Sequence, residues 1–274
     1  MSLTVNTNLT SMRAANSLNQ TQGKLSVTLS RVSSGLRVTK AADDAAGSAV
    51  AMNLKTQARS GRQAIRNAND GISVIQTAES ATKEVLNILD RMRELAVQGS
   101  SETLEDGERV YLDDEFEQLS DEIERIAQSS EFNDLALSDG TNSSLEVQVG
   151  VDASSNSRVS ITLGDLTVAS LGMTSVDLTS AGGSQSAITT IDSAIDDVNS
   201  VRADYGAVQN RLDSAVRNMS NYVESLSAAA SQIMDADYAH ETAEMTRLQV
   251  MQQAGVAALS QAKGINQSVI SLLG

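Results

Sequence analysis

The single histidine of the chain is the first residue whose side chain could carry out chemistry. His240 opens the run HETAE, which matches the first half of the zinc-binding pattern HExxH, but Glu244 stands where that pattern has its second histidine. At helical spacing His240 and Glu244 share a face, yet a stable zinc site needs a third and usually stronger ligand. We therefore expect an exposed helical histidine. The alternative of a different class is a secreted enzyme or metal-dependent hydrolase that uses His240, which zinc analysis with a His240→Ala control would test.

Two acidic groups have the residue types used in acid–base catalysis or calcium binding. They are the pair Asp43 and Asp44, and the cluster Asp113, Asp114, Glu115 and Glu117. Neither has EF-hand spacing, so helix caps and a solvated face are the expected roles. The chain has no cysteine, which excludes disulfides, zinc thiolates and cysteine nucleophiles. It also lacks the patterns GxxxxGK[ST], GxGxxG and GxSxG. We expect no catalytic residues, no metal site and no cofactor, and a protein that is not an enzyme.

The composition favours long helices. Among 274 residues there is no proline and no tryptophan, and aromatic residues make up only 2%. Proline normally ends helices and marks turns, so its absence permits long uninterrupted helices. With few aromatic residues, Ala, Leu, Val, Ile and Met must form the core, which suits helix-on-helix packing.

Charge is distributed unevenly along the chain, whose formal net charge is −15. Residues 1–100 have 12 Lys and Arg against 7 Asp and Glu, residues 101–200 have 3 against 21, and residues 201–274 have 5 against 7. A chain with this surplus of acid repels phosphate, so no nucleic-acid partner is expected, and the acidic middle third is interpreted as a solvated outer surface. No apolar run reaches the roughly 18 residues that span a bilayer, so no membrane insertion is expected. The start MSLTVNTNLTS lacks the basic and apolar regions of a cleavable signal peptide, so we expect any secretion to use another route.

Apolar spacing predicts three helical stretches in the first half of the chain. Leu18, Leu25, Leu29, Val32 and Leu36 follow each other at spacings of 7, 4, 3 and 4, which is helical periodicity. Residues 31–47, RVSSGLRVTKAADDAAG, predict a joint, with Asp43 or Asp44 able to start the next helix. That helix would continue to Gln98 and, at 1.5 Å per residue, extend about 84 Å. A third helix is predicted from Leu112 to Ile126.

The pattern changes to a period of two in the middle of the chain. Leu145, Val147, Val149 and Val151 alternate with polar residues, as do Val159, Ile161 and Leu163, which predicts a β-hairpin over about 145–163. Residues 174–186 are rich in Ser, Thr and Gly and predict a surface loop. Helical periodicity then resumes through 201–233 and again from Met245 to the C-terminus.

The predicted fold class is mainly α, a long antiparallel helical bundle or coiled coil formed by the N- and C-terminal regions with a small β-hairpin in mid-chain. Each terminal segment has an apolar stripe that a two-helix pair covers only partly, so another copy of the chain is the simplest partner. The residues expected to form this subunit interface are Leu18, Leu25, Leu29, Val32, Leu36, Leu248, Val256, Leu259, Val269, Leu272 and Leu273.

Several of these segments together resemble bacterial flagellin, the subunit of the flagellar filament. The matching motifs occur in the family's order: RVSSGLRVTKAADDAAG at 31–47, RNANDGISVIQTAE at 66–79, LDRMRELAVQGS at 89–100, YGAVQNRLDSA at 205–215, DADYAHE at 235–241 and MQQAGVAALSQA at 251–262. Against the family pattern, GINQS stands where relatives often have a proline, and the chain ends in Gly274. Only about 50 residues separate the third helix from the fourth, so the sequence resembles a minimal flagellin without large outer domains.

The resemblance implies a domain organisation and a function. It implies an inner terminal helical domain of residues 1–42 with 234–274, disordered in the free monomer and ordered on polymerisation. Residues 43–233 would form an outer helical bundle with the β-hairpin. The implied function is a structural subunit that self-assembles into the hollow helical filament used for motility. The alternative within related proteins is a hook–filament junction protein.

The resemblance also implies partners and a location. These are the flagellar type III export apparatus, a chaperone that covers the C-terminal segment, the filament cap and junction proteins, and an extracellular location in the filament. LDRMRELAV resembles the surface that a host Toll-like receptor recognises, with Arg91, Leu95 and Glu115 at matching positions. Some flagellins are O-glycosylated in the middle segment, and the candidates here are Ser143, Ser144, Ser154 and Ser155, within a cluster that includes Ser138, Thr141 and Ser157.

Overall fold

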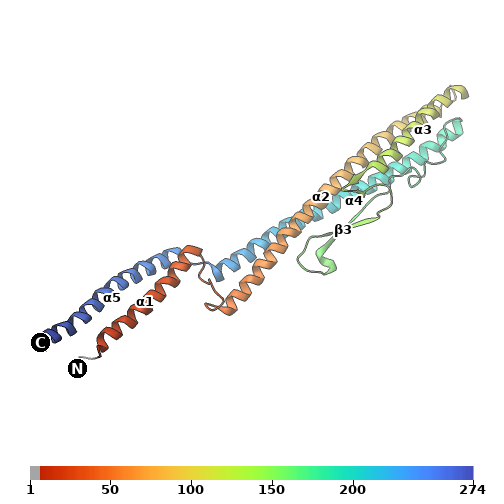
Figure 1. Cartoon of the computed structure of the whole chain (residues 1–274). Helices are drawn as coiled ribbons and strands as arrows, with labels where there is room; N and C mark the ends of the chain where they lie inside the picture. Colours follow the sequence, from red (N-terminus) through yellow and green to blue (C-terminus); the bar gives the residue numbers. More distant parts are fainter. Residues whose placement is uncertain (1–6, 274) are drawn as a thin grey trace. The chain divides into compact units, whose positions relative to one another are not determined.

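The described part of the chain is mostly helical (Figure 1). The computed structural model describes residues 7–273, and side chains over 7–264. Its α-helices are α1 (Leu9–Ser34), α2 (Ala45–Gly99), α3 (Asp106–Ser129), α4 (Ala181–Met234) and α5 (Tyr238–Leu273). Its strands are β1 (Glu131–Phe132), β2 (Leu135–Ala136), β3 (Ser144–Gln148) and β4 (Arg158–Thr162), with a short 3₁₀ helix η1 (Ser155–Ser157). The predicted fold class, mainly α with a small β element, is confirmed.

The long second helix predicted from the sequence is also confirmed. Helix α2 runs without interruption for 55 residues, and α4 runs for 54. Both lengths are several times that of an ordinary globular helix, and they are possible because no proline interrupts the backbone hydrogen bonds.

Local capping chemistry fixes the joint between α1 and α2. Gly35 has φ 69° and ends α1, donating its backbone N–H to the carbonyl of Arg31 at 2.8 Å, as glycine does at helix C-termini. The Asp44 carboxylate accepts the N–H of Gly47 at 2.8 Å and caps the start of α2, as the sequence predicted. The predicted α1 stripe was wrong at Leu36, which lies beyond the glycine cap and forms an isolated β-bridge with Asp235.

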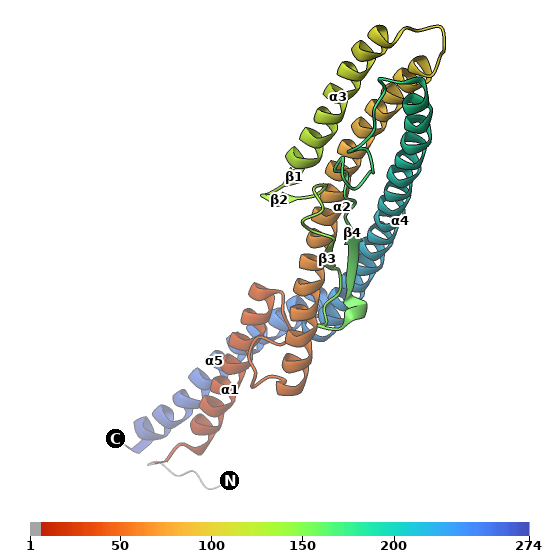
Figure 2. The same cartoon turned by 90° about the vertical axis from the view of Figure 1, so that its right-hand side faces the viewer.

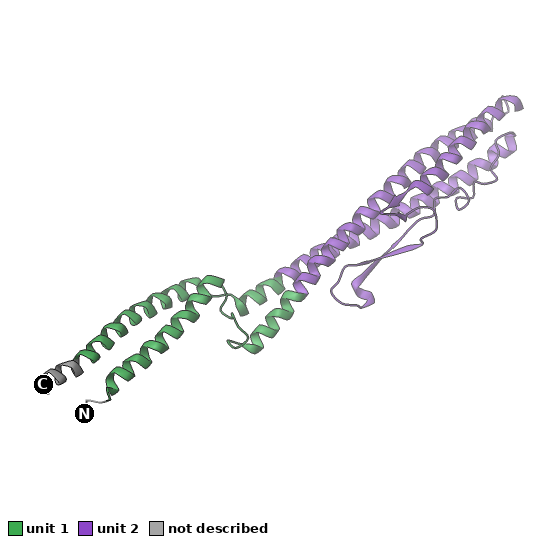
Figure 3. Ribbon diagram, viewed as in Figure 1, with its two compact units in different colours: residues 1–56, 225–274 green, residues 57–224 purple. Residues whose placement is uncertain are grey.

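Contacts divide the chain into two compact units (Figure 3). Unit 1 consists of Met1–Thr56 and Ser225–Gly274, and unit 2 of Gln57–Glu224. The predicted domain limits, 42/43 and 233/234, lie instead close to the two joints between helices, at the start of α2 and the end of α4. Because α2 and α4 each pass through the unit boundary, the domain assignment made from the sequence stays a prediction.

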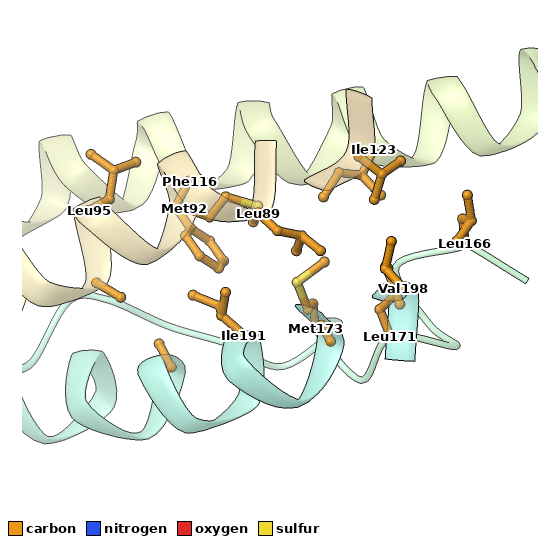
Figure 4. Close-up of a cluster of buried hydrophobic side chains, with 14 of the residues drawn as sticks. Leu89, Met92, Leu95, Phe116, Ile123, Leu166, Leu171, Met173, Ile191 and Val198 are labelled. Carbon is orange, nitrogen blue, oxygen red and sulfur yellow. The ribbon is translucent and has the colours of Figure 1, made fainter. Parts of the chain in front are cut away.

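Unit 2 is built on three helices lying side by side, α2, α3 and α4 (Figure 2). Their main core is shown in Figure 4, where apolar side chains from all three helices meet. Side chains of the 166–173 segment, which follows the hairpin, pack into this core beside those of the three helices. The labelled residues are Leu89, Met92, Leu95, Phe116, Ile123, Leu166, Leu171, Met173, Ile191 and Val198.

The predicted β-hairpin is confirmed, and the structure gives its register. Strands β3 and β4 pair antiparallel with Leu145 opposite Ile161 and Val147 opposite Val159. Val147, Val159 and Ile161 are buried in a second core cluster that includes Tyr205 of α4. The small β1–β2 pair was not predicted, because two residues per strand are too few to show a period.

The predicted surface loop at 174–186 was wrong over its last six residues. Helix α4 already begins at Ala181, and the Ser180 hydroxyl accepts the backbone N–H of Gly183 at 3.0 Å. The serine and glycine content that suggested a loop therefore includes a helix cap, which is one of the places where serine is favoured. Ser184 is fully buried and donates its hydroxyl to the carbonyl of Leu178 at 3.2 Å.

Candidate interaction surface on the terminal helices

In unit 1 the helices α1 and α5 lie against each other in antiparallel orientation (Figure 1). Buried or half-buried positions alternate at three and four residues along both helices, which is the spacing of a coiled-coil seam. On α1 these positions are Ser11, Ala14, Leu18, Thr21, Leu25, Thr28 and Val32, and on α5 they are Glu241, Met245, Leu248, Gln252, Gly255, Leu259 and Ala262. We call this set the α1–α5 seam.

The α1–α5 seam is unusually polar for a pair of this length. Thr21 and Thr28 are buried at positions where coiled coils normally have large apolar residues. Glu241 is also buried, and its carboxylate lies 3.4 Å from the Arg31 guanidinium. Leu248 is the only large apolar side chain of the seam that is fully covered, with 1% exposure. The two helices therefore hold each other with few buried apolar groups.

The residues predicted to form the subunit interface fall into four sets. Five of them, Leu18, Leu25, Val32, Leu248 and Leu259, belong to the α1–α5 seam within one chain. Leu29 and Val256 lie outside the seam and are 55% and 53% exposed. The side chains of Val269, Leu272 and Leu273 lie outside the described residues, and Leu36 belongs to the joint. Which of them contact another subunit stays a prediction.

Other exposed apolar side chains of α1 and α5 were missed by the sequence reasoning. The stripe predicted from leucine and valine alone passed through Leu29, whereas the true seam passes through Thr28. The alternation of three and four that includes Ala14, Thr21 and Thr28 was the available signal, and it places several apolar side chains outside. The exposed set on α1 and α5, which we call the outer apolar side chains, is Leu9, Met12, Val27, Leu29, Tyr238, Val250, Met251 and Val256.

His240 lies at an open groove of about 550 Å³ between α1 and α5. The groove is also lined by Lys24, Arg31, Glu241 and Glu244. The Arg247 guanidinium donates to Glu244 and holds the pKa of that carboxyl below its usual range. Among the described residues no group of three or more His, Cys, Asp or Glu is placed to hold a metal ion. His240 is exposed, as expected for a histidine on a helix surface.

The acidic pair and the acidic cluster singled out in the sequence each include residues with structural contacts. The Asp43 carboxylate accepts hydrogen bonds from the backbone N–H and hydroxyl of Thr39 and from the N–H of Lys40. These donors, the Lys40 N–H first, lower the pKa of Asp43. In the second group, Asp113 accepts the N–H of Leu178 at 2.9 Å, which ties α3 to the loop before α4.

The three residues that match the surface recognised by a Toll-like receptor, Arg91, Leu95 and Glu115, lie in different environments. Arg91 and Glu115 form a surface ion pair with a 2.8 Å contact, and Arg91 also contacts Glu94 at 2.9 Å. Leu95 is 1% exposed and lies in the unit 2 core, so its side chain is not part of the surface that Arg91 and Glu115 form (Figure 4). Among the candidate glycosylation residues, Ser143, Ser144, Ser154, Ser155 and Thr141 are exposed, Ser157 is half-buried, and Ser138 is buried.

Comparison with known proteins decides the family. A family model described as the bacterial flagellin N-terminal helical region matches residues 5–143, and one described as the C-terminal helical region matches residues 188–273. The chain belongs to the bacterial flagellin family. The two matched regions include α1 to α3 and nearly all of α4 and α5, so the family assignment applies to both compact units.

Similar flagellins match along nearly their whole length. The flagellin of Halalkalibacterium halodurans is 42% identical over 271 residues, which cover 98% of this chain and 99% of the relative. The flagellar filament 33 kDa core protein of Treponema phagedenis is 36% identical, again over 98% and 99%. A crystal structure of Bacillus cereus flagellin has 32% sequence identity and a TM-score of 0.51, covering 56% of this chain and 88% of that one.

A flagellin is a structural subunit of the flagellar filament, and the chain is therefore a filament subunit of the short type. The junction-protein alternative has less support: a hook-associated protein structure from Vibrio parahaemolyticus has a TM-score of 0.59 at 17% identity, which shows a shared fold alone. The family is a structural family, and its filaments are assemblies of identical subunits outside the cell. None of the described helices is both long and apolar enough to cross a membrane.

Proposed function

We propose that the chain self-assembles into a hollow helical motility filament by burying the outer apolar side chains of α1 and α5 against neighbouring copies. The observation that supports this most directly is their exposure: Leu9, Met12, Leu29, Val250 and Val256 are each more than half exposed in the single chain. Burying one such side chain fully is worth about 1.5–3 kcal/mol, so several together favour assembly strongly.

The weak α1–α5 seam supports a second part of the proposal, that these helices become fully ordered only on assembly. Isolated helices are marginal in water, and most helix stability comes from tertiary packing of an apolar face. The seam buries one large apolar side chain completely, whereas the outer apolar side chains are 44–62% exposed within the described chain. Neighbouring subunits would supply that cover, and the predicted tail residues Val269, Leu272 and Leu273 would join the same contacts.

The test uses two substitutions that change the outer side chains without touching the seam. Leu29→Arg and Val256→Arg each place a charge where we expect an apolar contact, and the critical concentration for seeded polymerisation should rise at least about tenfold. Asn199→Arg, at an exposed position of α4 in unit 2, is the matched control and should polymerise like the unchanged chain. Electron microscopy and sedimentation measure polymer, and circular dichroism measures helix content on the same samples.

Two results would contradict the proposal. One is normal filaments from Leu29→Arg and Val256→Arg, which would place the subunit contacts elsewhere. The other is a chain that is fully helical as a monomer and does not elongate from seeds of its own filaments. Leu259→Arg is less informative than these variants, because Leu259 belongs to the α1–α5 seam and its loss also weakens the single chain.

The remaining partners are proposals that rest on membership of the flagellin family. We propose export through the flagellar type III apparatus, protection of the C-terminal segment by a chaperone before export, and contact with cap and junction proteins in the extracellular filament. We also propose that the chain has no catalytic activity. A host Toll-like receptor would meet Arg91 and Glu115 on the surface of unit 2, while Leu95 would act through the core beneath them.

O-glycosylation of the middle segment is a proposal that four exposed serines support. Ser143 and Ser144 lie at the start of β3, and Ser154 and Ser155 lie at the turn of the hairpin. Ser138, which the sequence placed in the same cluster, is buried and is not a candidate. An intact mass equal to that of the bare sequence would exclude the modification.

A further inference from the structure

We propose that two charged stripes of unit 2, one basic on α2 and one acidic on α3, pair between copies of the chain and set a head-to-tail contact. This inference rests on the proposed self-assembly and names a second contact for it, away from α1 and α5. The basic stripe is Arg59, Arg62 and Arg66, and the acidic stripe is Asp114, Glu117 and Asp121.

The basic stripe consists of arginines that have no ion-pair partner within the described chain. Unit 2 has eleven arginines, and six of them form ion pairs: Arg91, Arg93, Arg109, Arg125, Arg158 and Arg202. The other five are Arg59, Arg62, Arg66, Arg211 and Arg217. Three of those five are exposed at spacings of three and four on α2, so they share one face of that helix.

The acidic stripe is what remains when the contacts of α3 are assigned. Helix α3 has nine acidic residues against two arginines. Six of the nine have partners in the chain: Asp106, Glu115 and Glu122 form ion pairs, and Glu108, Asp113 and Glu124 accept backbone N–H groups. Asp114, Glu117 and Asp121 are left without a partner among the described residues, and all three are exposed at spacings of three and four.

The geometry of the two stripes is complementary. Each stripe extends over seven residue steps, which is about 10.5 Å along a helix. Helix α3 runs antiparallel to α2, because Arg91 of α2 pairs with Glu115 of α3 beyond the turn that joins them. When two copies point the same way, Arg59 can lie opposite Asp121, Arg62 opposite Glu117 and Arg66 opposite Asp114, with a mismatch of about one residue rise.

The position of the stripes makes the contact open-ended. The Arg91–Glu115 pair places Glu117 level with about residue 89 of α2, roughly 40 Å along the helix from Arg62. The two stripes therefore cannot pair within one straight helical unit. A contact between different surfaces of identical molecules is heterologous, and when its rotation does not close it generates a filament. Tyr111, one turn from Asp114 on the same face and 74% exposed, adds an aromatic side chain of the kind enriched at interfaces.

Charge reversal with complementation tests the pairing in the full-length chain. The basic-stripe variant is Arg59→Glu, Arg62→Glu and Arg66→Glu, and the acidic-stripe variant is Asp114→Arg, Glu117→Arg and Asp121→Arg. We expect each variant alone to raise the critical concentration about tenfold or more, because three attractive pairs become repulsive. A 1:1 mixture of the two variants should regain polymerisation, since reversed stripes of one variant fit those of the other.

Matched controls reverse charges away from both stripes. They are Arg211→Glu with Arg217→Glu, and Asp196→Arg with Asp197→Arg, all exposed positions of α4. Each control should polymerise like the unchanged chain. At 1 M salt, where the screening length is about 3 Å, the critical concentrations of the two stripe variants should approach that of the unchanged chain. Salt would not restore polymerisation to a variant whose fold is damaged.

The outcomes separate this inference from the proposed function. If the unchanged chain elongates seeds, and both stripe variants do so equally well, the stripe pairing is wrong and self-assembly stands. If both variants fail and their mixture is no better than either alone, the pairing is also wrong. If the unchanged chain does not elongate, self-assembly itself is wrong. If a triple variant loses helix by circular dichroism, a double-mutant cycle replaces it. The cycle compares the critical concentrations of Arg62→Gln, of Glu117→Gln and of the chain that carries both substitutions, and it measures the same coupling.

Discussion

A buried guanidinium ties the end of α2 to the start of α3, and its removal should destabilise unit 2. Arg109 is 5% exposed and donates to the backbone carbonyl of Gly99 at 2.9 Å and to that of Ser101 at 2.8 Å. A third donation goes to the Asp106 carboxylate at 2.7 Å. Gly99 is the last residue of α2, where the final carbonyls of a helix have no partner within it, and Ser101 lies two residues beyond that end.

The magnitude follows from what each contact is worth. A hydrogen bond to a charged group contributes about 1.5–3 kcal/mol, so the two carbonyl contacts together contribute about 3–6 kcal/mol. Water can reach part of the site once the side chain is gone, because Ser101 is half-buried, so we expect Arg109→Ala to cost about 2–4 kcal/mol. The Asp106 contact adds little, since the Asp106 side chain is 88% exposed.

The assay is thermal unfolding followed by circular dichroism, on the full chain without seeds. At about 2–4 °C per kcal/mol for a unit of this size, Arg109→Ala should lower Tm by roughly 5–15 °C. Arg109→Lys keeps the charge but lacks the fork of donors, so it should recover only part of the loss. Arg125→Ala is the matched control on the same helix, because Arg125 forms an exposed pair with Glu122, and its Tm should hardly change. Equal Tm values for Arg109→Ala and Arg125→Ala would refute the capping role.

Two further predictions concern α2 and α4 in unit 2. Gly61→Ala should lower the free energy of unfolding by about 1 kcal/mol, because its new Cβ would lie 2.6 Å from Val223 Cγ2 and this overpacking exceeds the gain in helix propensity. Gly206→Ala, whose new Cβ would have no atom within 4 Å, should raise the free energy of unfolding by about 0.5–1 kcal/mol. A change of the same sign for both variants would contradict this reasoning. Burial raises the pKa of Tyr205, so the folded state favours the neutral form of its side chain. The stability that this contributes is complete at pH values below the pKa of an unfolded tyrosine, and it is lost as pH rises through the raised pKa of the folded state. A titration at 295 nm should show a late ionisation that Tyr205→Phe removes, and an unchanged titration would refute the assignment.

The sequence predicted the elements of this fold well where one physical signal dominated. Strict alternation at Leu145, Val147, Val159 and Ile161 predicted the hairpin, because only one of its faces is buried. The absence of proline predicted α2 as one long helix. The prediction of a loop over 174–186 was wrong in its second half because serine and glycine, as at Ser180 and Gly183, are common both in loops and at helix N-termini. The hydrogen bond between these two residues shows that they form a helix start here.

The candidate surface was harder to predict because its defining positions are polar. A stripe read from leucines passes through Leu29 and Leu36, whereas the seam passes through Thr21 and Thr28 and ends before Gly35. The charged stripes could not be found from sequence at all. Their meaning depends on which of the other arginines and carboxylates are already paired, and pairs such as Arg93 with Asp192 join residues 99 positions apart.

The placement of apolar and polar side chains on α1 has a consequence for the order of assembly. A seam rich in large apolar residues would make the α1–α5 pair stable alone and would leave little free energy to be gained from neighbours. Here the threonines lie inside and Leu9, Met12 and Leu29 lie outside, so the proposed assembly would release most of the burial energy only when copies meet. The charged stripes of unit 2 act differently, since exposed ion pairs contribute little affinity but orient an encounter. Together they favour contacts in which unit 2 sets the register and the terminal helices then provide most of the stability.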